Sequence, residues 1–259
     1  MFRKAILTTV SAVAMMSAPA LADDLNFAGV LSGNYVHTGS DLPDANGWGI
    51  NGAAAIDLSD TGFAAELDAG HNHLSISSAD ANDWNVGGSL FWKCPEGRFG
   101  ANVNYTEVNL SVLSLSGNAH ATNYGGFGEY FASDMFTLGG KAGGFSGDLN
   151  GLYVGGGVTG YVFPDFAVTA SVNFTNFNHA FQETDLGLSG EYLISEEIPV
   201  SGFVGYTYSD LSNGGGNANT VFVGLRLYTN TTGAATLVER QRSGTIGSLA
   251  TFGPLGMNL

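Results

Sequence analysis

The residues best suited to covalent chemistry are His73 and Ser75, in the segment HNHLSIS. Two residues apart, they share one face of a β-strand. There the imidazole could take the proton of the hydroxyl, so that the serine oxygen becomes a nucleophile. A third residue would have to orient the imidazole, and Asn82 and Asn85 are the candidates. Pairs of His and Ser also arise freely in polar segments, and no further catalytic context surrounds this one. We therefore predict no enzyme and interpret His71 and His73 as interfacial polar residues.

Charged side chains form a second candidate site. In segments where polar and apolar residues alternate, eight of them fall on the polar face of a predicted β-strand. Five are carboxylates and three are cations: Asp57, Glu66, Asp68, Lys93, Glu129, Lys141, Glu191 and Arg226. Two interpretations stay open. The residues could line a water-filled path that prefers cations, or they could pair into salt bridges that fill a narrow interior.

Metal and cofactor sites are weakly indicated. The five histidines do not have ligand spacing, and the glycine-rich segments lack the strand–turn–helix context of nucleotide binding. Four loop aspartates could bind Ca²⁺ or bridge it to lipopolysaccharide phosphates, but solvated acidic loops are the better explanation: Asp41, Asp44, Asp80 and Asp83. The single cysteine, Cys94, excludes an internal disulfide and lies in a predicted turn, KCPEGR. We predict no metal and no cofactor.

The elements that would position these residues are β-strands. The segment FAVTASVNF at 166–174 alternates strictly, with Phe166, Val168 and Val172 on one face and Thr169 and Asn173 on the other. The same period of two recurs along the chain. Twelve strands are predicted, within a range of 10 to 14, at 25–36, 48–58, 63–70, 84–93, 99–106, 123–131, 136–144, 152–162, 166–174, 185–193, 200–210 and 219–229.

The connections between these strands alternate between short and long. Short turns such as SDTG, SDM and PD alternate with longer polar loops such as HTGSDLPDANG and SVLSLSGNAHAT. Aromatic residues follow the short turns at Phe63, Phe99, Phe136 and Phe166. Aromatic rings settle at membrane interfaces, so the pattern predicts an aromatic belt at each rim of a membrane-spanning structure, with the apolar face of each strand towards lipid.

The N-terminus indicates export. Arg3 and Lys4 precede an apolar run and then Ala20-Leu21-Ala22, which is typical of a secretory signal at 1–22. Only 12% of the residues are charged, against about 25% in soluble domains, and the net charge is −15. The low content of charge suits strands that face lipid, and the acidic balance argues against nucleic acid as a partner.

Together these features resemble Gram-negative outer-membrane porin-like β-barrel proteins. The resemblance covers 23–230 and implies an all-β fold, an antiparallel up-and-down barrel with both termini in the periplasm. It implies lipid, lipopolysaccharide and the barrel-assembly machinery as partners, and passive diffusion of small hydrophilic solutes, preferably cationic ones. The alternatives are a structural or surface-interaction barrel with a blocked lumen and, through His73 and Ser75, a lipid hydrolase. Residues 231–259 depart from the family, whose chains commonly end with the last strand. We interpret them as a flexible periplasmic tail rather than a plug, with a helical turn or two around ATLVERQR.

Overall fold

The fold was analysed in a computed structural model of the chain. It describes residues 26–40, 44–58, 62–76, 79–112, 115–178, 181–195, 199–212, 216–230 and 233–246. The predicted signal peptide, 1–22, and the last part of the tail, 247–259, lie outside the described residues.

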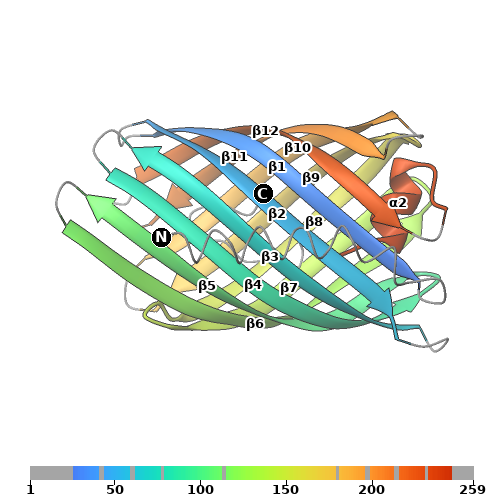
Figure 1. Cartoon of the computed structure of the whole chain (residues 1–259), viewed down its shortest axis with the longest axis horizontal. Helices are drawn as coiled ribbons and strands as arrows, with labels where there is room; N and C mark the ends of the chain where they lie inside the picture. The colour runs from blue at the N-terminus through green and yellow to red at the C-terminus, as the bar shows by residue number, and fades with distance from the viewer. Residues whose placement is uncertain are drawn as a thin grey trace.

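The described chain forms a closed barrel of twelve antiparallel strands (Figure 1). Each strand pairs with its neighbours in sequence, and β1 closes the barrel against β12 from Ala28↔Asn230 to Ser40↔Ala218. The strand count and the up-and-down order match the prediction. The strands are β1 Phe27–Ser40, β2 Ala45–Asp57, β3 Phe63–Ile76, β4 Ala79–Cys94, β5 Gly97–Val112, β6 Leu115–Ser133, β7 Phe136–Gly147, β8 Gly151–Phe163, β9 Phe166–Phe177, β10 Gln182–Ser195, β11 Val200–Leu211 and β12 Gly216–Asn230.

Alternation along each strand separates the two faces of the wall. On β9, the side chains of Val172 and Phe174 are exposed on the outside, whereas Thr169, Ser171 and Asn173 line the interior. On β3, Leu67 is 68% exposed while its neighbours Glu66 and Asp68 are only 2% and 5% exposed. An apolar outer surface on a closed barrel is what a bilayer requires, because closure leaves no unpaired strand edge in lipid.

The two ends of the barrel differ, but less in loop length than the sequence predicts. Short turns join β4 to β5, β6 to β7 and β8 to β9 at one end, which we call the short-turn end. At the other end, residues 79–83 and 115–122 were predicted as loops and are strand instead. Polar residues there still alternate and pair across strands, so the ladder continues where a loop was expected. The predicted strands are right in position but too short.

Aromatic side chains mark the outside of the short-turn end on β3 to β8 and on β10. Each of the following is exposed: Phe63, Trp92, Phe99, Tyr130, Phe136, Phe163 and Tyr192. Trp48 and Tyr124 are exposed on β2 and β6, towards the other end of the barrel. Their places fit the two predicted belts.

One helix, α2 (Leu237–Ser243), follows the barrel at the short-turn end, shown in red in Figure 1. Thr236 caps its N-terminus and accepts a hydrogen bond from the Glu239 amide, while the Glu239 carboxylate accepts from the Thr236 and Ala235 amides. These amides lower the pKa of Glu239. The reciprocal cap stabilises a helix of only seven residues, which would not persist alone.

Candidate functional site

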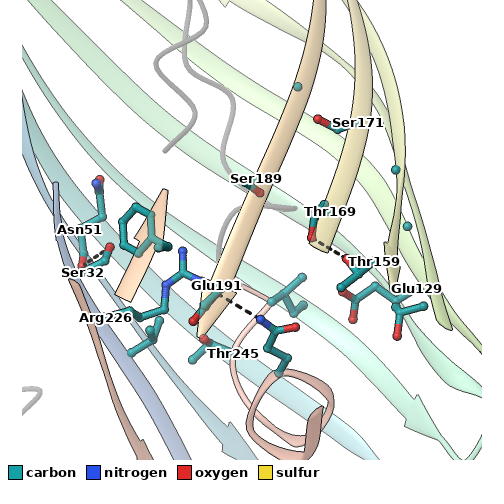
Figure 2. A pocket seen from close by; sticks show the side chains of 18 of the residues that line it. Ser32, Asn51, Glu129, Thr159, Thr169, Ser171, Ser189, Glu191, Arg226 and Thr245 are labelled. Carbon is teal, nitrogen blue, oxygen red and sulfur yellow. Dashed lines mark hydrogen bonds and ion pairs between the residues drawn. The ribbon is translucent and has the colours of Figure 1, made fainter. Parts of the chain in front are cut away.

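The candidate site is a cavity of about 350 Å³ inside the barrel (Figure 2). All the strands surround the lumen, and the residues that follow β12 form part of the cavity boundary. Between the charged residues, hydroxyl and amide side chains line the cavity together with glycines, at Asn51, Asn85, Thr159, Thr169, Ser171, Asn173, Ser189 and Thr207. Such groups can exchange hydrogen bonds with water or with a hydrophilic solute.

The charged residues that the sequence singled out all lie on the inner face, but in three settings. Five line the cavity: Asp68, Glu129, Lys141, Glu191 and Arg226. Glu66 is buried and accepts a hydrogen bond from the Ile246 amide at 2.6 Å. Asp57 and Lys93 form an ion pair at 2.6 Å and are not among the residues that line the cavity.

Glu191 on β10 is the centre of a hydrogen-bonded cluster on the cavity wall. It accepts from the Arg226 guanidinium at 2.5 Å, from the Tyr228 hydroxyl at 2.6 Å and from the Ser201 hydroxyl at 2.5 Å. The Arg226 guanidinium also lies 4.9 Å from the centre of the Phe203 ring. A charge that is paired and hydrogen-bonded in this way can be retained in a poorly hydrated interior.

Arg98 on β5 is the centre of a second hydrogen-bonded cluster, on another part of the wall. Its Nε donates to Glu129 Oε2 at 2.7 Å, and the same guanidinium donates to the carbonyls of Gly244 at 2.8 Å and Gln241 at 2.9 Å. Arg98 is not among the predicted inward-facing residues, because the sequence pattern places it in the turn KCPEGR. Its parity with Asn102 and Asn104 was the signal that could have placed it on the inner face.

Two further carboxylates face the lumen and accept hydrogen bonds from neutral groups. Asp68 accepts from the Asn104 amide at 3.0 Å, and Asp185 accepts from the Ser209 hydroxyl at 2.6 Å. Asp185 also interacts electrostatically with Lys141. The predicted strand at 185–193 begins with Asp185, but only Glu191 in it was predicted to face inward. The two residues have the same parity, so Asp185 could have been predicted as well.

The described part of the tail is docked in the barrel, which corrects the interpretation of a flexible tail. The side chain of Leu237 is fully buried and that of Ile246 is 4% exposed. Gln241 donates to Glu191 at 3.1 Å and accepts from the Tyr161 hydroxyl at 3.0 Å. Hydrogen-bond partners on the wall and burial of two apolar side chains give this segment a fixed place. The helix around ATLVERQR is confirmed.

On the outer face, the structure pairs His73 with one of its two proposed partners. His73 Nδ1 lies 2.9 Å from Asn82 Oδ1, and the two residues are directly opposite each other on β3 and β4. Asn85 is instead opposite Gly70 and lines the cavity. Ser75 is exposed on the same outer face as His73, and the Trp48 ring is 6.0 Å from the His73 ring.

Other candidate features give no site among the described residues. No three side chains of His, Cys, Asp or Glu gather closely enough there to hold a metal ion. Cys94 is a half-buried thiol whose Sγ lies 3.4 Å from the Gly97 carbonyl oxygen. No helix in the described ranges is long and apolar enough to cross a membrane.

Comparisons with known proteins find similarity in structure but not in sequence. No protein-family model matches the chain, and no curated protein matches it either. An outer-membrane channel from Pseudomonas putida F1 superimposes with a TM-score of 0.57 at 11% identity, over 79% of this chain and 95% of that one. The KdgM porin in complex with disordered oligogalacturonate superimposes with a TM-score of 0.53 at 13% identity, over 76% of this chain and 98% of that one. The chain therefore has the fold of outer-membrane porins and channels, as its sequence pattern predicts.

Proposed function

We propose that this protein is a porin-like outer-membrane channel for the passive diffusion of small hydrophilic solutes. The observation that carries the proposal is a hydroxyl- and amide-lined cavity inside a barrel with an apolar outer wall. A packed structural barrel would have filled that space with interlocking side chains. The fold shared with known channels supports the same conclusion.

Charge narrows the class of solute to cations and neutral molecules. Several inward carboxylates accept hydrogen bonds from neutral groups, as Asp68 does from Asn104, whereas Lys93, Arg98 and Arg226 are in ion pairs. Among the described residues, the cavity lining has four carboxylates and four cations, but one of the cations, Arg242, belongs to the tail segment. Without that segment the wall has an excess of one carboxylate, which raises the local concentration of cations. The oligogalacturonate of the KdgM complex is a polyanion, so the proposed solutes of this chain do not include it.

Ion conductance in planar bilayers tests the channel. The mature protein should be compared with a chain that ends at residue 232, because all the strand pairs that close the barrel lie before that point. We expect at least the shortened chain to conduct steadily, with cations preferred over anions. If both chains are correctly folded and electrically silent, the channel proposal is wrong.

The location and orientation belong to the same proposal: the outer membrane, with the short-turn end and both termini in the periplasm. In a Cys94→Ser background, Ser116→Cys at the far end should react with an impermeant thiol reagent on intact cells. Asp134→Cys, in the turn between β6 and β7, should react only after the outer membrane is broken. The reverse labelling pattern would invert the orientation.

A structural or surface-interaction barrel is the second candidate, and the docked tail favours it. If the segment around α2 never leaves the lumen, the barrel conducts nothing. The conductance comparison between the full and the shortened chain separates this candidate from the channel.

A lipid hydrolase is the third candidate, favoured by the 2.9 Å contact between His73 Nδ1 and Asn82 Oδ1. That contact leaves the other imidazole nitrogen to act as a base. We still expect no release of fatty acid from phospholipid or lipopolysaccharide by the purified protein. Release that disappears in Ser75→Ala, but not in the distant control Ser116→Ala, would establish this activity instead.

A further inference from the structure

The segment from Thr236 to Ile246 crosses the lumen from one wall to the opposite wall. At its start, Leu237 packs against Tyr161 of β8, Ala167 of β9 and Leu193 of β10. At its end, Ile246 joins a cluster with residues of β2, β3, β4 and β6, namely Ala55, Ala64, Phe91 and Phe127. In a closed ring of twelve strands, β9 and β3 are diametrically opposed. The two apolar anchors therefore sit on opposite sides of the short-turn end.

Polar contacts hold the middle of the segment between these anchors. The Arg98 guanidinium reaches the Gln241 and Gly244 carbonyls from β5. Arg242, from α2 itself, donates to the Ser133 carbonyl at 2.6 Å and to the Thr137 hydroxyl at 3.2 Å. Gln241, Arg242, Thr245 and Ile246 line the cavity, so the segment bounds it on the side of the short-turn end.

Two ion pairs of the wall stay intact if the segment leaves. Arg98 keeps its ion pair with Glu129, and Glu191 keeps Arg226 as well as the Tyr228 and Ser201 hydroxyls. The barrel itself is closed by β1 and β12 and needs no contact with α2. Release would open no strand edge and would break neither ion pair. Glu66 would lose the Ile246 amide, but the departure of Ile246 would also expose that carboxylate to water in the lumen.

We propose that residues 236–246 are a gate, a plug that closes the channel at the short-turn end and leaves the lumen without unfolding the barrel. This inference rests on the proposed function as a channel. Two apolar anchors stabilise the docked state, together with hydrogen bonds to carbonyls of the plug. Water can replace these hydrogen bonds, and the loss of entropy on ordering the segment opposes docking. A balance of that kind allows both states to be populated.

Trypsin tests the docking independently of conductance. The other basic residues of the described chain, Lys93, Arg98, Lys141 and Arg226, lie in strands, whereas Arg240 and Arg242 lie in α2. Arg240 is only 6% exposed in the docked state. The folded wild-type protein should resist cleavage, and Leu237→Ser/Ile246→Ser should be trimmed to a barrel ending at Arg240 or Arg242, as measured by intact mass.

Two further variants sharpen that measurement. Leu149→Ser, an equal change at an exposed residue between β7 and β8, should leave the resistance unchanged. Arg98→Lys keeps a cation beside Glu129 but cannot reach two carbonyls at once, so it should be cleaved faster than wild type. Cleavage of the wild type as fast as the anchor variant would overturn the docked plug.

Conductance then tests the gate. The shortened chain and the anchor variant should conduct roughly tenfold more than the wild type, as expected when a largely closed population is shifted to open. Equal conductance of all three would overturn the gate and leave the channel standing. If the folded shortened chain is silent, the channel and the gate both fail, and trypsin resistance then identifies α2 as a permanent part of a structural barrel.

Discussion

The inner wall formed by β7, β8 and β10 differs from the wall formed by β3 to β6. The first presents glycines to the cavity, at Gly139, Gly155, Gly157 and Gly187, together with small hydroxyl side chains. The second presents Asp68, Asn85, Arg98 and Glu129. Glycines of the first wall thus leave space, and its cavity-lining carboxylates, Asp185 and Glu191, each interact with a cation. The second wall contains Asp68, which instead accepts a hydrogen bond from the neutral Asn104 amide.

The difference explains why a barrel of this size has a cavity at all. Interiors of barrels with eight strands are filled by side chains, and those with sixteen leave an aqueous channel, so twelve strands alone decide nothing. Here the missing side chains of one wall leave about 350 Å³ empty. The openness of the lumen depends on glycine positions as much as on strand number.

Filling the glycine wall should have the largest effect. Gly187→Tyr, made in the chain that ends at residue 232, should remove most of the single-channel conductance because the ring projects into the cavity. The new Cβ would meet the Ser171 hydroxyl at 2.5 Å, and that hydroxyl can rotate away. Gly126→Tyr is the matched control, because Gly126 has the outward parity of Tyr124, is not among the residues that line the cavity, and its Cβ would meet only the Gly100 carbonyl at 3.7 Å. Equal conductance in both variants would show that the solute path avoids the cavity.

Removing charge from the other wall should have an intermediate effect. Asp68→Asn in the shortened chain should lower the ratio of cation to anion permeability by about twofold at low salt, and by less at high salt, where charges are screened. Asp185→Asn should change the ratio less, because Asp185 already interacts with Lys141. A larger effect at Asp185 than at Asp68 would reverse the roles assigned to the two walls.

The cap of α2 should have the smallest effect. Thr236→Ala removes an N-cap worth about 1 kcal/mol and should modestly accelerate tryptic cleavage of the full chain. No change in the cleavage rate would mean that wall contacts alone hold the plug.

Acidity should weaken the same cap. Backbone amides lower the pKa of Glu239, so its stabilisation is present above the ordinary carboxyl pKa and is lost as the pH falls through the depressed value. Conductance of the full chain should therefore rise on acidification by more in wild type than in Glu239→Gln. An identical pH response in the two proteins would exclude Glu239 as a contributor.

The sequence by itself determined the wall of this protein. A period of two is a local property, so the twelve strands, the apolar outer face and the inward parity of Glu66, Asp68 and Glu191 could be derived residue by residue. Strand ends were less certain, because residues 79–83 and 115–122 are polar enough for a loop and still alternate well enough to pair. The choice of Asn82 over Asn85 as the partner of His73 needed the register of β3 against β4.

Only the tertiary structure decided what fills the short-turn end. The contacts of Arg98 with Gln241 and Gly244 join residues 143 and 146 positions apart, and the contact of Glu66 with Ile246 joins residues 180 apart. Nothing in ATLVERQR indicates which surface will receive Leu237, because the receiving pocket is assembled from strands that meet only when the barrel closes. The wall follows from repeated local pairing, whereas the plug depends on the completed ring.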